Sequence, residues 1–158
     1  MFLTKSGRSA LIKREGNELT AYQDGAGVWT IGVGHTGPEV HSGMRISQKQ
    51  ADAYFSQDIK WAERAVQSLV KVSINRNQFD TLVSFTFNVG AGAFRSSTLL
   101  KELNKGNYSA VPQQLMRWNL ITVEGEKIVS RGLVNRRVSE VAQWNGVDVT
   151  VDSQCGDA

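Results

Sequence analysis

The stretch REGNELTAYQDGAGVWTIGVGHTG, residues 14–37, combines the end of a helix with a glycine-rich strand pattern. Gly16 directly follows SALIKRE, and glycine is the residue best suited to the C-terminal cap of a helix. Further along, VWTIGV is rich in the β-branched and aromatic residues that favour strands, and glycines flank it. We therefore predict a short helix over residues 6–15 and a hairpin or three-stranded sheet over residues 22–34.

The composition is that of a folded domain. Of the 158 residues, 41% are hydrophobic and 21% are charged, which is ordinary for a globular protein and not for a disordered or membrane-embedded one. A chain of this length can bury a core without disulfides or metals. The single cysteine, Cys155, has no partner for an internal disulfide and lacks the neighbours of a zinc site. We expect neither a metal nor another cofactor.

The chain shows no targeting signal. It has no run of about 18 apolar residues, the minimum for a membrane-spanning helix. The N-terminal residues MFLTKSGRSALIKREG also lack the apolar region and cleavage site of a signal peptide. We therefore expect a protein without a signal peptide or membrane anchor, which stays in the cytoplasm where it is made.

The charge balance indicates a class of partner. The net charge of +3 favours a polyanion such as nucleic acid, an anionic envelope polymer or a membrane surface. No basic-aromatic stripe or helix-turn-helix pattern is present, so we expect no nucleic-acid partner.

The clearest helical pattern begins at Ser47. With Gln50, this residue forms a Ser-x-x-Gln capping box, in which each side chain bonds the backbone N–H of the other residue. Apolar residues then recur at steps of three and four over several turns, which is typical of an amphipathic helix. We predict one continuous helix over residues 47–70 that joins two lobes.

The rest of the chain predicts mainly helices. Apolar periodicity, interrupted by glycine or Asn-Gly, indicates helices over residues 79–89, 97–104, 108–118 and 133–144. Between the last two, LITVEGEKIV alternates around Glu124–Gly125 and predicts a small hairpin.

The predicted fold class is α+β, predominantly helical. It has a sheet-bearing lobe at residues 16–58 and a helical lobe at residues 59–145, to which the helix at 6–15 belongs. Residues 146–158 show no regular pattern beyond a brief alternation, so we expect a mobile tail there.

Three polar residues of the opening stretch suggest a reaction. Glu15 lies in the last turn of the predicted helix, where the negative end of the macrodipole disfavours ionisation and so favours a general acid. Taken alone, Glu15 could be a solvated residue at a frayed end, Asp24 a turn residue and Thr30 an ordinary strand residue. Together they are the groups needed to hydrolyse a glycosidic bond, by protonating the leaving oxygen and aiming a water molecule.

The same segment resembles the catalytic stretch of the phage-type lysozymes, the endolysins of glycoside hydrolase family 24. Their signature is Glu, eight residues, Asp or Cys, five residues, Thr, and Glu15, Asp24 and Thr30 match both spacings. The resemblance continues through FNVGAGAFRSSTLLKELNKGNY (87–108), QLMRW (114–118) and GLVNRRVSE (132–140). It covers nearly all of the chain.

The resemblance implies a lysozyme-like fold with a cleft between two lobes. It also implies a muramidase that cleaves the β-1,4 bond between N-acetylmuramic acid and N-acetylglucosamine in bacterial peptidoglycan during host lysis. Glu15 is then the general acid, while Asp24 and Thr30 position water or stabilise the cation. The positions that would bind substrate are Gly34, Phe87, Asn88, Ser97 and Arg117. Phe87 is equally well explained as a core residue, and Asn88 as a helix cap.

Charged residues outside these positions are given structural roles. Asp58 lies on the apolar stripe of the long helix, where an unpaired carboxylate is costly, so we predict an ion pair with His35. Arg131, Arg136 and Arg137 form a basic cluster that is either a solvated face or, for Arg136 or Arg137, a partner of Glu15.

Two other functions remain open. A lytic transglycosylase needs the acid but not a second carboxylate, and an inactive peptidoglycan-binding module would keep only the fold. For the leading hypothesis we expect a monomer that waits in the host cytoplasm and reaches the periplasm and wall through a holin-type partner. The stereochemical outcome depends on the distance between the carboxyl groups, and the sequence leaves it open.

Overall fold

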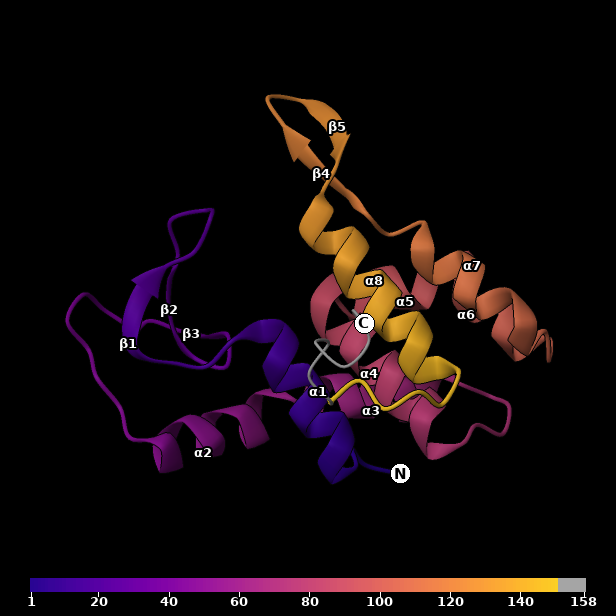
Figure 1. Ribbon diagram of the computed structural model, residues 1–158, viewed down its shortest axis with the longest axis horizontal. Coiled ribbons are helices and arrows are strands. Elements are labelled where there is room, and N and C mark those ends of the chain that lie inside the picture. Colours follow the sequence, from indigo (N-terminus) through magenta and orange to yellow (C-terminus); the bar gives the residue numbers. More distant parts are fainter. Residues whose placement is uncertain (151–158) are drawn as a thin grey trace, which may run out of the picture. The chain divides into compact units, whose positions relative to one another are not determined.

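The computed structural model describes residues 1–150, which form two compact units (Figure 1). The sheet unit is Ser9–Trp61, and the helical unit consists of Met1–Arg8 and, among the described residues, 62–150. Helix α1 (Lys5–Glu15) begins in the helical unit and ends in the sheet unit. Most of α1 is therefore grouped with the sheet, whereas we had expected the whole helix in the helical lobe. The predicted α+β, predominantly helical class is confirmed.

Both ends of α1 are capped, which fixes the position of Glu15. At its start, the N–H of Gly7 donates to the Thr4 hydroxyl at 2.9 Å. At its end, Gly16 adopts a φ of +84°, and its N–H donates to the carbonyl of Ile12 at 2.8 Å. Gly16 is thus the predicted C-terminal cap, and Glu15 is the last helical residue.

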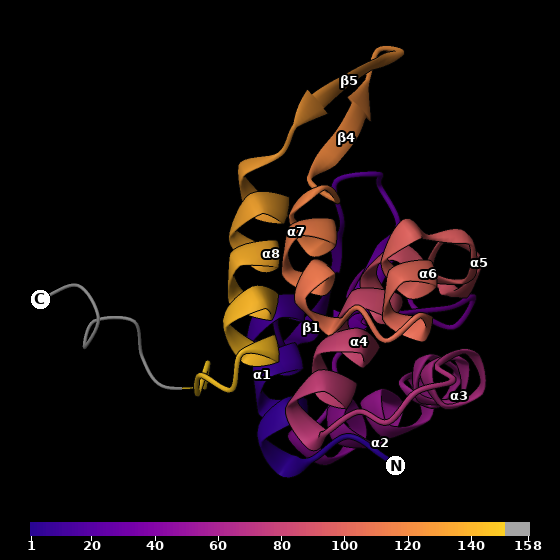
Figure 2. The ribbon, with the colours of Figure 1, turned by 90° about the vertical axis from the view of Figure 1, so that its right-hand side faces the viewer.

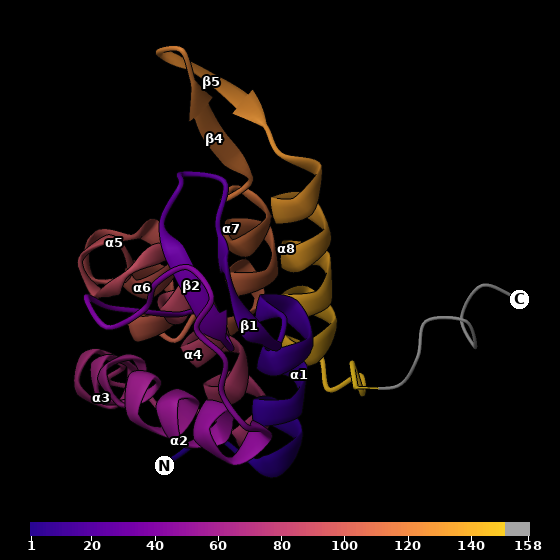
Figure 3. The ribbon, with the colours of Figure 1, turned by 90° about the vertical axis from the view of Figure 1, so that its left-hand side faces the viewer.

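The sheet unit contains the predicted three-stranded antiparallel sheet (Figure 3). Its strands are β1 (Glu18–Gln23), β2 (Trp29–Gly32) and β3 (His35–Thr36), in that spatial order. Tyr22 pairs with Thr30 and Gln23 with Trp29. The sheet begins at Glu18, earlier than the predicted start at residue 22.

The capping box at Ser47 is confirmed, but the single helix over residues 47–70 is wrong. The Ser47 hydroxyl accepts from the Gln50 N–H, and the Gln50 side chain accepts from the Ser47 N–H. The chain then forms α2 (Gln48–Asp58) and α3 (Lys60–Leu69), separated at Ile59. The apolar stripe is continuous, yet it serves two cores, because α2 packs on β2 and β3 whereas α3 belongs to the helical unit.

The helical unit is built around α4, whose residues 79–86 are all buried. Helix α4 packs against α5 and α8, and α7 packs against α8 (Figure 2). The remaining elements are α5 (Ala91–Ser96), α6 (Thr98–Asn104), a 3-10 turn (Tyr108–Ala110) and α7 (Val111–Met116), with α4 at Arg76–Val89 and α8 at Arg131–Trp144. Our prediction omitted α5, because Gly90 and Gly92 gave this short segment the appearance of a loop.

The predicted hairpin around Glu124–Gly125 is confirmed. Strands β4 (Leu120–Val123) and β5 (Glu126–Val129) pair in antiparallel register, and the hairpin projects beyond the helices of its unit (Figure 1). Glu124 and Gly125 both have positive φ, +50° and +83°, as a type I′ turn requires.

Two sequence predictions concern membranes and the C-terminus. In residues 1–150, no helix combines the length and apolar character needed to cross a bilayer. Most of the predicted tail at 146–158, from residue 151 onward, lies outside the described residues, and so does Cys155. Within the described part, Val147 still donates its N–H to the carbonyl of Ala142 at 2.9 Å.

Candidate active site

The β1–β2 hairpin gathers three polar side chains on one face. Tyr22 lies directly opposite Thr30 in the antiparallel register, and the N–H of Asp24 donates to the carbonyl of Val28 at 2.9 Å, which continues that register. Cross-strand partners share a face, and side chains alternate along a strand. Tyr22, Asp24 and Thr30 therefore lie on the same side of the hairpin, whereas Gln23 and Trp29 lie on the other.

Asp24 is a turn residue with acceptor capacity left over. Its Oδ1 accepts from the N–H groups of Ala26 at 2.8 Å and Val28 at 2.9 Å. The side chain is exposed, and within residues 1–150 no hydrogen bond to Oδ2 is present. The turn role and the catalytic role are therefore compatible, because each uses a different oxygen of one carboxylate.

Thr30 is held rigidly by its own strand. It is 4% exposed, and its hydroxyl donates to the carbonyl of Val28 at 3.0 Å. Since the hydroxyl proton is committed there, the Thr30 oxygen can offer lone pairs to a further donor.

Glu15 reaches the sheet from the end of α1. Its Oε1 lies 3.4 Å from the position that a Cβ at Gly34 would occupy, and Gly34 has a φ of +69°. A side chain at residue 34 would press on the carboxylate and strain the backbone. Gly34, one of the predicted substrate-binding residues, therefore lies directly beside the predicted general acid.

Tyr22 lies on the same hairpin face as Asp24 and Thr30. Burial raises the pKa of the Tyr22 phenol, and three carboxylates raise it further, in the order Glu18, Glu15, Asp24. The phenol is therefore less acidic than an ordinary tyrosine. Our sequence analysis did not select Tyr22, although its position two residues before Asp24 on an alternating strand was a usable signal.

The predicted pair between His35 and Asp58 is confirmed and has a further partner. His35 Nδ1 lies 2.7 Å from Asp58 Oδ2, and Nε2 lies 2.6 Å from Glu39 Oε1. The Tyr54 ring stacks on the imidazole with centroids 3.9 Å apart. Burial lowers the pKa of His35, but the hydrogen bonds and charges of Glu39 and Asp58 outweigh burial and raise it. The group joins β3, its following loop and α2, and so supports the sheet.

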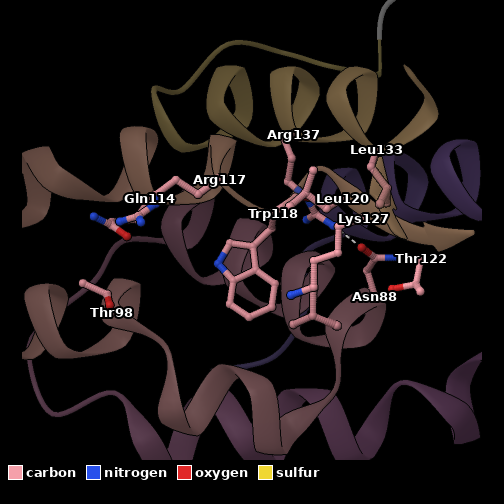
Figure 4. A pocket seen from close by; sticks show the side chains of 11 residues that line it. Asn88, Thr98, Gln114, Arg117, Trp118, Leu120, Thr122, Lys127, Leu133 and Arg137 are labelled. Atoms are coloured by element: carbon pink, nitrogen blue, oxygen red, sulfur yellow. Dashed lines mark hydrogen bonds between the residues drawn. The ribbon is translucent and has the colours of Figure 1, made fainter. Parts of the chain in front are cut away.

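The helical unit contains a cavity of about 600 Å³. Trp118 lies at its centre, with Asn88, Gln114 and Arg117 around it (Figure 4). Thr122 and Lys127 of the β4–β5 hairpin form one wall. No acidic residue lines the cavity in the described chain, so it suits a polar ligand with neutral or negative groups.

The structure separates the predicted substrate-binding residues of this unit. Asn88 and Arg117 both line the cavity. Ser97 is buried, and its hydroxyl caps α6 by accepting from the Leu100 N–H at 3.1 Å while donating to the Phe94 carbonyl at 2.7 Å. Phe87 is half-buried on α4 and is not among the lining residues. The neighbouring Thr98 lines the cavity instead of Ser97.

The three arginines of the predicted cluster have different environments. Arg137 is fully buried and donates to Glu140, to the Asn88 side chain and to the Trp118 carbonyl at 2.9 Å. Its guanidinium also lies 5.0 Å from the centroid of the Phe85 ring.

Arg136 contacts Glu140 at 3.4 Å and the Ser84 carbonyl at 3.1 Å, and Arg131 is exposed. Sequence reasoning missed Glu140, although it lies three and four residues after the two arginines, the spacing of helical ion pairs. A pair between either arginine and Glu15 stays a prediction.

No metal role is indicated for these groups. Across residues 1–150, no three His, Cys, Asp or Glu side chains are placed to hold a metal ion together. The chemistry available on the hairpin face is acid–base chemistry of carboxylates with an adjacent hydroxyl.

Comparison with known proteins confirms the resemblance. The model of the family "Phage lysozyme" matches residues 12–140. An endolysin of Acyrthosiphon pisum secondary endosymbiont phage 1 is 39% identical over 142 residues, which cover 90% of this chain and 97% of that protein.

Two solved structures agree. An endolysin from Escherichia coli O157:H7 phage FAHEc1 aligns with a TM-score of 0.88 at 39% identity, covering 91% of this chain and 93% of its own. The muramidase domain of SpmX from Asticaccaulis excentricus aligns with a TM-score of 0.84 at 34% identity, covering 90% and 97%. This protein therefore belongs to the phage lysozyme family and is a glycoside hydrolase of the endolysin type.

Proposed function

We propose that the protein is a muramidase that hydrolyses the β-1,4 bond between N-acetylmuramic acid and N-acetylglucosamine in peptidoglycan. The observation that carries the proposal is the arrangement of the sheet unit. Asp24 and Thr30 share one face of the β1–β2 hairpin, and Glu15 Oε1 reaches the same unit beside Gly34. Two carboxylates near one hydroxyl are the groups that glycosidic hydrolysis needs.

Glu15 acts as the general acid. It is the last residue of α1, and its Oε1 lies beside Gly34. The proton passes to the glycosidic oxygen as the bond to the anomeric carbon breaks, so that the leaving sugar departs as a neutral alcohol. Gly34 carries no side chain that would cover the Glu15 carboxylate.

Asp24 and Thr30 hold the attacking water. Both offer acceptors, because Asp24 Oδ2 has no other use among the described residues and the Thr30 proton is given to Val28. A water that donates one hydrogen to each must direct a lone pair away from the hairpin. Asp24 then removes a proton as the water attacks the anomeric carbon. Direct attack in a single displacement inverts that centre.

The cavity of the helical unit has side chains of its own that suit a segment of peptidoglycan. Asn88 and Arg117 are suited to bind hydroxyl, amide and carboxylate groups of the polymer, and Trp118 offers an apolar face. Phe87 and Ser97 act on this region indirectly, through the packing of α4 and the cap of α6. A positively charged wall fits a polymer that carries carboxylates.

The proposed biological setting is host lysis. The enzyme acts as a monomer, remains in the host cytoplasm until a holin-type partner permeabilises the membrane, and then reaches the periplasm and the wall.

The test compares three proteins on purified peptidoglycan, with release of new reducing ends as the readout. Wild type releases them, and Glu15→Gln loses about 10²- to 10⁴-fold in rate, the usual contribution of a general acid. Glu18→Gln is the matched control, an exposed acid of the same unit, and it keeps activity near wild type. Wild type that binds peptidoglycan without cleaving it would indicate a binding module instead.

A further inference from the structure

The proposed reaction site has more hydrogen-bond acceptors than donors. The carboxylate of Asp24 only accepts, Glu15 gives its single proton to the leaving oxygen, and the Thr30 proton is bound to the Val28 carbonyl. The sugars of peptidoglycan carry hydroxyl, ether and acetamido oxygens, which need donors. These three side chains alone cannot hold a sugar.

Tyr22 is placed to supply a donor. It faces Thr30 across the strand pair, two residues before Asp24 and on the same face. The side chain is half-buried, and its hydroxyl makes no hydrogen bond to any residue in 1–150. In contrast, the Tyr108 hydroxyl donates to the Ser73 carbonyl at 2.6 Å. The Tyr22 hydroxyl is thus presented to the reaction site without a protein partner.

The surroundings keep this phenol neutral. Burial and the charges of Glu18, Glu15 and Asp24 raise the pKa of Tyr22 above its ordinary value, so the proton stays on the phenol over the whole working range of the acids. Tyr22 is therefore a constant donor beside groups whose protons move.

We propose that the Tyr22 hydroxyl donates a hydrogen bond to an oxygen of the sugar bound at the cleavage point. Tyr22 is then a substrate-binding residue that holds the anomeric carbon between Glu15 and the water on Asp24 and Thr30. This assignment rests on the proposed muramidase function.

The first test is Tyr22→Phe, which removes only the hydroxyl. Loss of one hydrogen bond to substrate lowers kcat/KM by about 3- to 10-fold, whereas the melting temperature stays at the wild-type value because no protein partner is lost. Tyr108→Phe is the matched control. It loses a hydrogen bond to Ser73 and leaves kcat/KM unchanged.

The second test measures binding without turnover. In the Glu15→Gln background, adding Tyr22→Phe raises the dissociation constant of a tetrasaccharide of alternating N-acetylglucosamine and N-acetylmuramic acid by about 3- to 10-fold. Titration calorimetry provides the readout. An unchanged dissociation constant overturns the proposal, whatever happens to turnover, because a residue that only shapes the hairpin would not contact the sugar.

The outcomes separate this inference from the proposed function. If wild type cleaves, Glu15→Gln does not, and Tyr22→Phe matches wild type in kcat/KM, the muramidase assignment stands and the role of Tyr22 is overturned. If wild type releases no reducing ends from peptidoglycan, both are overturned.

Discussion

Asp24 of the sheet unit and Glu140 of the helical unit are held in opposite ways. Asp24 is exposed in a turn, and two backbone N–H groups bind only one of its oxygens. Glu140 is fully buried, and Arg136, Arg137 and Ser84 bind both of its oxygens.

The other buried acids of the helical unit also accept hydrogen bonds from the chain. Asp80 accepts from the N–H and hydroxyl of Thr4, and Glu63 accepts from the N–H of Leu3 at 2.8 Å. Both acids fasten the N-terminal segment to the unit. Burial raises the pKa of Asp80, and its bonds to Thr4 oppose the rise. A carboxylate surrounded by donors maintains the fold, whereas one with an oxygen facing solvent remains available for reaction.

The largest expected effect is on activity, at Asp24. Asp24→Asn keeps an oxygen to accept from Ala26 and Val28, so the turn persists, but it replaces Oδ2 by an amide that cannot accept a proton. We expect the rate of peptidoglycan cleavage to fall by about 10²- to 10⁴-fold, with the melting temperature unchanged. If Asp24→Asn instead unfolds at a lower temperature but cleaves peptidoglycan at the wild-type rate, Asp24 has a structural role like that of Glu140.

The opposite result is expected at Glu140. Glu140→Gln leaves two cations in a buried site without an anion, which lowers the free energy of unfolding by about 3–5 kcal/mol. The rate per folded molecule stays near wild type. Denaturant titration measures the loss, and Glu102→Gln, which removes a partly exposed pair with Lys105 at 3.7 Å, serves as a control with an effect of about 0–1 kcal/mol. Equal losses of unfolding free energy in Glu140→Gln and Glu102→Gln would show that the buried Glu140 does not stabilise the fold more than an exposed acid does.

A smaller effect, dependent on pH, is expected at His35. Its pKa is raised in the folded protein, so its stabilising contribution is complete below the unfolded pKa of about 6.5 and disappears as pH rises through the folded pKa. The His35 hydrogen bond lowers the pKa of Glu39. Glu39 therefore contributes above an unfolded pKa of about 4.3, and that contribution disappears as pH falls.

The measurement is the free energy of unfolding between about pH 4 and pH 9. This range extends to both sides of the ordinary histidine pKa of about 6.5. Wild type loses stability above about pH 6.5. Asp58→Asn is less stable than wild type at pH 6 by about 1.5–3 kcal/mol, and its loss at alkaline pH is smaller. A variant with the wild-type pH dependence would show that the pair does not support the sheet unit.

The smallest predicted effect is at the start of α2. Ser47→Ala removes the cap of the Gln50 N–H and lowers the free energy of unfolding by about 1 kcal/mol without changing the rate of cleavage. Ser47→Asp retains an acceptor and restores most of the loss. Thermal unfolding of the three proteins measures both effects, and an Ala variant as stable as wild type would be inconsistent with the capping box.

Features set by neighbouring residues could be predicted from the sequence. The cap at Gly16, the box at Ser47 and the turn at Glu124–Gly125 each depend on local backbone geometry. The pair of His35 with Asp58 was also predictable, because a carboxylate on an apolar stripe requires a partner.

Features set by tertiary packing could not be predicted from the sequence. The break between α2 and α3 at Ile59 is not marked by a glycine or proline in the sequence. It occurs because the two helices pack on different cores. The burial of Arg137 with Glu140 likewise depends on how α4, α7 and α8 enclose it. Glu39 was missed as the second partner of His35, although it follows at i+4.

The candidate site shows the same division. The spacing of Glu15, Asp24 and Thr30 identifies the reaction through the family resemblance. The use of each Asp24 oxygen, the direction of the Thr30 proton and the presence of Tyr22 depend on the strand register, which spacing alone does not give.

The central claim is that water attacks the anomeric carbon. The most direct test is to digest purified peptidoglycan in oxygen-18 water and measure the masses of the fragments by mass spectrometry. If a water held by Asp24 and Thr30 attacks while Glu15 protonates the leaving oxygen, each new reducing end carries one heavy oxygen. Fragments that end in an anhydro sugar without the label would show that no water attacks, and would contradict the account.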